Sequence, residues 1–214
     1  MSDLMSDLVR QYLDGLVPPR AAELQAMEEH ARATDFPIIG PAAGQFCYLI
    51  TRLLGARKVF EMGSGFGYST AWFARGVVEN GGGTVHHVVW DADLSRRAVA
   101  HLGRLGYGGT IAYHVGEAVA TLESMSGGFD VIFNDIDKRA YPESLPVIRR
   151  KLRPGGVLII DNMLWHGRIF DDADNSPTTA GVREFTRLIT ADPAWIVSLV
   201  PIRDGLILAQ LVGP

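Results

Sequence analysis

Short apolar runs that alternate with amphipathic stretches, from residue 57 onward, constrain this chain more than any other feature. The strand-like runs cover residues 58–62, 85–90, 110–115, 129–134 and 157–160. Helical patterns lie between them at residues 68–78, 94–105 and 141–152. Nearly continuous apolar strands separated by helices are typical of a parallel sheet that helices cover on both faces. The sequence therefore predicts an α/β fold.

The segments on either side of this alternation have a different pattern. Helical patterns precede it at residues 3–15, 20–33 and 42–54. After a further helix at 178–190, β runs at 195–202 and 206–211 are joined through Asp204-Gly205, a hairpin signal that adds an antiparallel edge. Residues 153–156 are expected to form a turn. Without a linker or repeat, we expect one domain over 1–214, with helices in 1–55 and the core in 56–214.

Composition excludes several classes of function. The chain has 214 residues, of which 47% are hydrophobic, and a net charge of −4 with no dense basic cluster. This balance argues against a nucleic-acid partner and favours a small substrate. No apolar run approaches the roughly 20 residues that span a bilayer, and we expect no membrane partner. The single Cys47 suits a reducing cytoplasm. The sequence MSDL occurs at both 1–4 and 5–8, so either Met1 or Met5 is a possible start.

A glycine-rich loop joins the first predicted strand to the next helix. Its glycines allow a tight turn and close approach of a ligand to the backbone. Counted from Gly63, the sixth position is Tyr68, where the dinucleotide-binding fingerprint has glycine or alanine. The lysine of a phosphate-binding loop is also missing after these glycines. Glu61 would oppose a pyrophosphate but suits S-adenosylmethionine, which carries a sulfonium, an ammonium and no phosphate. A plain strand–helix turn with a solvated or capping Glu61 remains the alternative.

Acidic side chains follow three of the predicted strands. Asp91 closes the second strand, where it would accept hydrogen bonds from a ribose or cap the next helix. Asp135 follows the fourth strand, and Asp161 and Asn162 follow the fifth. If these two strands are neighbours, two carboxylates and an amide oxygen converge, a set that suits Mg²⁺. The alternative is that the acids cap helices.

The motifs together resemble the caffeoyl-CoA/catechol O-methyltransferase family. The similar segments are residues 39–46 (IGPAAGQF), 61–69 (EMGSGFGYS), 135–138 (DIDK) and 161–165 (DNMLW), within a resemblance that runs over 35–212. It implies a Rossmann-like class I methyltransferase fold: a mostly parallel seven-stranded sheet with an antiparallel C-terminal hairpin strand, helices on both faces and extra N-terminal helices. It also implies S-adenosylmethionine, a divalent cation such as Mg²⁺, a small phenolic acceptor and a homodimer.

The resemblance also implies roles for individual residues. Lys138 and Asp135 would be catalytic, with Lys138 beside the reacting hydroxyl, although a merely solvated lysine is the alternative. Asp135, Asp161 and Asn162 would bind the metal. Residues implied to bind the methyl donor are Ile39, Glu61, Gly63, Ser64, Gly65, Ser69, Asp91, Ala92, Glu117, Ala118, Asp135 and Asp137.

Some features depart from the family pattern or leave alternatives open. Asn134 replaces the apolar residue that usually precedes the metal aspartate, and residues 171–179 resemble bacterial members more than plant ones. The acceptor is therefore either a catechol-type phenol or another small molecule. Trp165 would wall the acceptor site or pack between a loop and the sheet. Tyr68 and Glu61 disfavour a nicotinamide dehydrogenase. A nonenzymatic donor-binding protein would be expected to have lost Lys138 or the Asp-Asn pair.

Overall fold

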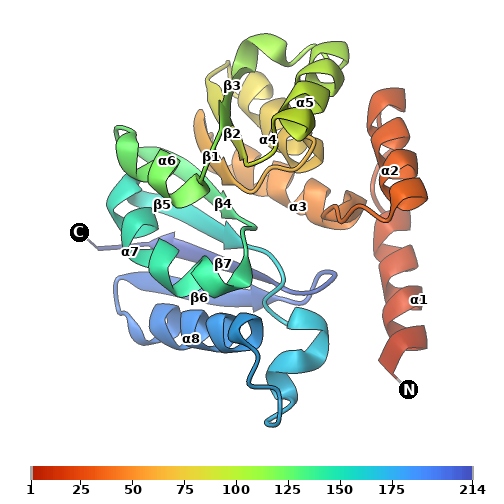
Figure 1. Ribbon diagram of the computed structural model, residues 1–214. Coiled ribbons are helices and arrows are strands. Elements are labelled where there is room, and N and C mark those ends of the chain that lie inside the picture. The colour runs from red at the N-terminus through yellow and green to blue at the C-terminus, as the bar shows by residue number, and fades with distance from the viewer. Residues whose placement is uncertain (1, 214) are drawn as a thin grey trace.

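The computed structural model describes residues 2–213, with side chains from Asp7 onward, and these residues form one seven-stranded sheet (Figure 1). The strand order is β3-β2-β1-β4-β5-β7-β6. Its strands are β1 (Lys58–Met62), β2 (Thr84–Val89), β3 (Ile111–Val115), β4 (Phe129–Asn134), β5 (Leu152–Ile160), β6 (Trp195–Val200) and β7 (Leu206–Leu211). The first five pair in parallel, and β7 runs antiparallel to both β5 and β6. The predicted mixed sheet with an antiparallel C-terminal hairpin is confirmed.

Helices cover both faces of this sheet, as expected. They are α1 (Ser2–Gly15), α2 (Ala22–Thr34), α3 (Gly40–Leu53), α4 (Tyr68–Glu79), α5 (Ala92–Arg104), α6 (Ala118–Ser124), α7 (Tyr141–Lys151) and α8 (Pro177–Ala191). Short 3₁₀ segments are η1 (Gly108–Thr110), η2 (Lys138–Ala140) and η3 (Trp165–Phe170). In Figure 1, α3, α4 and α5 lie on one side of the sheet and α6, α7 and α8 on the other, while α1 and α2 stand beside α3. Among the described residues, none of the helices combines the length and apolar character that crossing a membrane requires.

The strands supply two hydrophobic cores because successive side chains of a strand point to opposite faces. Val59 and Val131 pack with α2, α3, α4 and α5 in one core. Phe60 and Ile132, their neighbours along β1 and β4, pack with α6, α7 and α8 in the other core. The central strands β1 and β4 are therefore buried on both faces, except at Lys58 and Asp130 near their beginnings. Asp91, Asp135 and Asp161 follow the carboxyl ends of β2, β4 and β5, and this is the edge that forms the site.

The predicted turn at residues 153–156 is wrong, because these residues belong to β5. Phe129 pairs with Leu152, and Val131 pairs with Val157, so the register between β4 and β5 shifts between these pairs. Extra residues on one strand of a pair are accommodated as a bulge, which bends the strand without ending it. Gly155, at φ +76°, supplies the left-handed conformation there. The Pro-Gly-Gly sequence marks this irregularity inside the strand.

Candidate active site

A cavity of about 710 Å³ opens at the carboxyl ends of the parallel strands. The loop before α3, the glycine loop after β1, the end of β2 and the residues that follow β4 and β5 surround it. Open α/β sheets bind ligands at this edge. Most of the predicted site residues line the cavity together: Ile39, Gly63, Ser64, Gly65, Ser69, Asp91, Ala118, Asp135, Asp137, Lys138 and Asn162.

The remaining predicted residues lie behind the cavity wall or beside it. Glu61 and Asp161 are buried at the ends of β1 and β5. Ala92 is the first residue of α5. Glu117 caps α6, its carboxylate accepting hydrogen bonds from the backbone N–H groups of Val119 and Ala120 at 2.8 and 2.5 Å. A direct contact between the Glu117 carboxylate and the methyl donor therefore remains a prediction.

Glycine is required at position 63 by a close approach of two backbones. Gly63 has φ +87°, and a Cβ atom there would lie 2.4 Å from the carbonyl oxygen of Asp135. Asp135 in turn donates its backbone N–H to the carbonyl oxygen of Met62 at 2.9 Å. The glycine loop thus lies directly against the first residue after β4. Contacts of this kind join the predicted donor site to the predicted metal site.

Ser64 fixes the other side of the loop. Its hydroxyl accepts a hydrogen bond from the backbone N–H of Val88 at 2.9 Å and donates one to the carbonyl oxygen of Glu61 at 3.2 Å. The Ser64 backbone N–H also donates to the carbonyl oxygen of Val88 at 2.9 Å. The loop is therefore tied to both β1 and β2, which gives a ligand a preformed surface.

Glu61 is a fully buried carboxyl group beneath the glycine loop. Its Oε2 accepts a hydrogen bond from the hydroxyl of Thr70, and Thr70 also contacts Nδ1 of His87 at 3.0 Å. Burial raises the pKa of Glu61 to about 7, although hydrogen bonds from Ser69 and Thr70 oppose that shift. Within the part of the chain that the structure describes, Oε1 of Glu61 has no hydrogen-bond partner. A cation placed next to Oε1 would favour the ionised form.

The adjacent histidines His86 and His87 have structural positions in this arrangement. His87 is fully buried behind Thr70, and burial lowers its pKa to about 3, so its ring is neutral near pH 7. His86 is contacted by the ring of His114, with 3.1 Å between Nδ1 and Nε2. Neither histidine lines the cavity.

Asp91 and Asp137 both cap helical segments at the cavity. Asp91 Oδ1 accepts hydrogen bonds from the backbone N–H groups of Asp93 and Leu94 at 2.6 and 3.2 Å. Asp137 accepts one from the backbone N–H of Arg139 at 2.9 Å. The capping alternative is thus observed for Asp91, which nevertheless faces the cavity, and its contact with a ribose stays a prediction.

The acids after β4 and β5 converge, as the sequence predicted for neighbouring strands. Asn134 of β4 pairs with Ile160 of β5, so the next residues, Asp135 and Asp161, leave the sheet side by side. Asp161 is only 1% exposed. Burial and the neighbouring Asp135 raise the pKa of Asp161 to about 6, and the Arg203 guanidinium opposes this shift.

Asn162 completes the predicted metal-binding set. It has φ +60°, and its side-chain nitrogen donates a hydrogen bond to Oδ2 of Asp204 at 3.0 Å. This bond fixes the amide with its nitrogen toward Asp204, so its oxygen is the atom left for a ligand. Asp204 also accepts a hydrogen bond from the backbone N–H of His166 at 2.6 Å.

The residues present fit a hard divalent cation. No group of three His, Cys, Asp or Glu side chains suited to a metal occurs within residues 2–213, so the amide of Asn162 is needed alongside the two acids. Two carboxylates and an amide oxygen are the donors that Mg²⁺ accepts, with water or substrate in the other positions. Lys138 Nζ lies 2.7 Å from Asp135 Oδ1, and Arg203 Nη1 lies 2.7 Å from Asp161 Oδ2. These two side chains supply the same total charge as one divalent cation.

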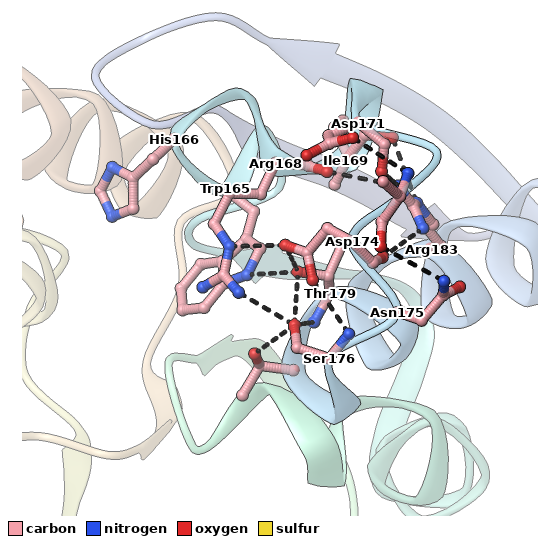
Figure 2. Close-up of polar contacts among 12 residues, drawn as sticks. Trp165, His166, Arg168, Ile169, Asp171, Asp174, Asn175, Ser176, Thr179 and Arg183 are labelled. Carbon is pink, nitrogen blue, oxygen red and sulfur yellow. Dashed lines mark hydrogen bonds and ion pairs between the residues drawn. The ribbon is translucent and has the colours of Figure 1, made fainter.

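Trp165 stands at the cavity on a loop that a polar network holds in place (Figure 2). Its indole N–H donates to the hydroxyl of Thr179 at 3.1 Å, and that hydroxyl donates to Asp174 at 2.8 Å. Arg168 pairs with the same carboxylate at 2.7 Å. Trp165 therefore packs against the second hydrophobic core and is bonded to α8 while it lines the cavity, and its contact with an acceptor stays a prediction.

Arg183 of α8 fixes the backbone of the same loop. Its guanidinium donates hydrogen bonds to the carbonyl oxygens of Arg168, Ile169, Asp171 and Asp174. The side chain of His166 points away from this network in Figure 2 and is largely exposed, as expected for a surface loop residue.

Several cavity residues were not predicted from the sequence. Phe36 and Trp90 add aromatic surface to the cavity, and Arg203 enters it from the loop between β6 and β7. Arg203 and Asp204 were interpreted only as part of a hairpin turn. The signal that could have indicated more was the charged Arg-Asp pair in a turn next to a sheet edge rich in acids.

Comparison with known proteins agrees with this geometry. Residues 19–212 match the family model described as O-methyltransferase. A catechol O-methyltransferase of Niastella koreensis is 30% identical over 98% of this chain and 99% of its own length. The O-methyltransferase from Bacillus cereus, solved in complex with SAH, is 29% identical with a TM-score of 0.86 over 95% of this chain and 97% of that one. The O-methyltransferase TomG of Streptomyces achromogenes, involved in tomaymycin synthesis and solved with SAM, is 25% identical with a TM-score of 0.87 over all of both chains. The chain belongs to the O-methyltransferase family.

Proposed function

We propose that this O-methyltransferase moves a methyl group from S-adenosylmethionine (SAM) to a hydroxyl of a catechol-type phenol, with the help of a divalent cation. The observation that carries the proposal is one cavity lined by two sets of residues. The glycine loop and Asp91 lie at one end, and Asp135, Lys138 and Asn162 lie at the other. Methyl transfer needs the donor and the acceptor oxygen in line at one site, and a single cavity lined by both sets of residues supports the proposal.

The donor end suits SAM better than a nucleotide phosphate. Glu61, with an unpartnered oxygen among the described residues, would repel a pyrophosphate and attract a cationic group. Asp91, at the end of β2, adds a second negative charge that lines the cavity. Both relatives named above that were solved with a ligand hold SAM or SAH, which supports the same donor.

At the acceptor end, Asp135, Asp161 and Asn162 would hold the divalent cation. When bound, such a cation supplies positive charge that favours ionisation of an acceptor hydroxyl near pH 7. Lys138 is nearly buried, and its ammonium pairs with Asp135 and donates to the carbonyl oxygen of Ile136 at 3.3 Å. From that position Lys138 would stabilise the phenolate as an ammonium, or would take the hydroxyl proton as a neutral amine once it has given up its own proton. The centroid of the Trp165 ring lies 5.8 Å from Lys138 Nζ, and the indole would pack against a flat aromatic acceptor.

A catechol-type acceptor is favoured by the acid pair next to a lysine and aromatic surface. The name of the Niastella koreensis relative is consistent with it. The alternative is a non-catechol small molecule, which the involvement of TomG in tomaymycin synthesis keeps open. Comparing methylation of an acceptor that has two neighbouring hydroxyls with methylation of one that has a single hydroxyl distinguishes these alternatives.

The test is methyl transfer from SAM to catechol and to phenol, before and after EDTA treatment and after Mg²⁺ is restored. We expect EDTA to abolish methylation of catechol, Mg²⁺ to restore it, and phenol to be a poor acceptor throughout. SAM binding, measured by calorimetry on the EDTA-treated protein, should be largely kept because the donor end is built from β1 and β2. Equal turnover by the metal-stripped protein would overturn the role of the cation, and Asp135 and Asp161 would then be acceptor-binding or structural groups.

A further inference from the structure

Arg203 forms an ion pair with Asp161, one of the predicted metal ligands. Its Nη1 lies 2.7 Å from Oδ2 of Asp161. The other carboxylate oxygen, Oδ1, accepts the backbone N–H of Asn162 at 2.8 Å. Both oxygens of Asp161 are therefore engaged within the protein. A divalent cation such as Mg²⁺ needs its oxygen ligands at about 2.0–2.1 Å, so a cation at Oδ2 would compete with the guanidinium for that oxygen.

The backbone around Arg203 is held firmly, which leaves the side chain as the part that can move. Arg203 has φ +55° in the loop between β6 and β7. The backbone N–H of Gly205 donates to the carbonyl oxygen of Ile202 at 2.9 Å, and Asp204 is tied to Asn162 and to His166. The Arg203 side chain is 28% exposed and lines the cavity, so it has open space next to its present position.

Electrostatics explains why an arginine stands there. A carboxylate that is 1% exposed and lies beside a second acid is costly without a cation. Lys138 pairs with Asp135, and Arg203 pairs with Asp161. When a divalent cation brings its own charge to the two acids, the guanidinium is no longer needed there and is repelled by the cation.

We propose that Arg203 is a built-in counter-ion of Asp161 that competes with the divalent cation, so that this arginine weakens metal binding and stabilises the metal-free protein. The proposal rests on the metal site of the proposed function. It makes Arg203 a positioning residue, because it acts on the metal only through Asp161.

The experiment is calorimetric titration of Mg²⁺ into the full-length, EDTA-treated protein and into Arg203→Met and Arg203→Lys. Arg203→Met removes the charge and keeps much of the side-chain length, whereas Arg203→Lys keeps a charge. The control is Arg150→Met, because Arg150 pairs with Glu123 on the exposed surface and does not line the cavity. We expect Arg203→Met to bind Mg²⁺ on the order of tenfold more tightly than the parent, since a charged hydrogen bond no longer competes. Arg203→Lys should lie between them, and Arg150→Met should match the parent.

Thermal unfolding gives a second readout that does not depend on turnover. In EDTA, Arg203→Met should unfold at a lower temperature than the parent, and saturating Mg²⁺ should shrink the difference. The same Mg²⁺ affinity in Arg203→Met and the parent would overturn the proposal even if catechol methylation requires the metal. If neither protein binds Mg²⁺ and EDTA leaves turnover unchanged, the proposed metal site itself fails, and the inference fails with it.

Discussion

At the scale of a single residue, we expect Glu61 to make donor binding sensitive to pH. Its pKa is raised to about 7 by burial, so part of the population is protonated near neutral pH. A cationic donor favours the ionised carboxylate, and binding to the protonated form must release a proton. Affinity for SAM should therefore increase as the pH rises through about 7, by up to tenfold per unit below that pH.

The measurement is the dissociation constant of SAM by calorimetry between about pH 5.5 and 7.5, below the range in which a free amino group loses its proton. Glu61→Gln is the matched control, because it keeps the shape and cannot ionise. It should bind SAM more weakly and with a flat profile. A flat profile in the parent protein would show that Glu61 does not change its protonation on binding.

Asp91 combines a structural and a predicted binding role, and two substitutions separate them. Asp91→Ala removes both the cap of α5 and the carboxylate at the cavity. We expect SAM binding to weaken by about 1.5–3 kcal/mol, as for a lost charged hydrogen bond. The lost cap should lower the free energy of unfolding by about 0.5–2 kcal/mol. Asp91→Asn keeps a good capping residue, so it should retain stability and still bind SAM more weakly. Unchanged SAM affinity in both variants would remove Asp91 from the donor site.

The sequence indicates some site residues better than others, for a physical reason. Asp135 and Asp161 each follow the last residue of a buried strand, so the strand order alone brings them together. Arg203 reaches Asp161 across 42 positions of the chain, from a turn whose path depends on Asp204 and Gly205. No local pattern reports such a contact. The capping role of the Glu117 carboxylate likewise became clear only with the start of α6 in place.

At the scale of elements, the loop 165–176 and α8 act as a unit that positions Trp165. The Asp174 carboxylate accepts hydrogen bonds from Thr179 and pairs with Arg168, and these contacts depress its pKa well below the usual range. Asp174→Ala should loosen the hold on the Trp165 indole. We expect KM for a catechol acceptor to rise on the order of tenfold, below the roughly hundredfold that misplacing a reacting group costs. Affinity for SAM should stay close to that of the parent.

Steady-state kinetics with a varied acceptor, together with tryptophan fluorescence quenching by acrylamide, measures this effect. Glu184→Ala is the control, because Glu184 pairs with Arg187 on the outer surface of the same helix. It should change neither quantity. An unchanged acceptor KM in Asp174→Ala would mean that Trp165 is held by packing alone or does not contact the acceptor.

Strands and helices were predictable where periodicity runs over several residues, and less so where it does not. The largely apolar runs of β1 and β4 gave their positions closely. The short helix α6 was not predicted, because its seven residues span barely two turns and its start depends on the Glu117 side chain. The error at residues 153–156 has a similar origin, since proline and glycine signal both turns and bulges and only the pairing with β4 decides between them.

At the scale of the whole molecule, α1 leaves an apolar surface facing outward. Leu8, Val9 and Tyr12 are exposed, and their spacing places them along one side of the helix, while Leu16, directly after the helix, is exposed too. Leu49 and Leu53 of α3, the helix that α1 contacts, are exposed too. In Figure 1, α1 and α2 stand at the side of the molecule. An apolar surface made by several residues on adjacent helices favours association of chains.

We therefore predict a homodimer formed through α1 and α3. Light scattering at micromolar concentration should give twice the chain mass of 23.3 kDa. The double substitution Leu8→Glu with Tyr12→Glu places charges on the α1 surface without touching either hydrophobic core, so it should give a monomer with unchanged helix content by circular dichroism. The matched control is Ile196→Glu, on the exposed side of β6, which should leave the mass of the parent. A parent protein that already has the mass of one chain would contradict the prediction. A dimer that Ile196→Glu disrupts and the α1 substitutions do not would place the interface at the β6 edge of the sheet.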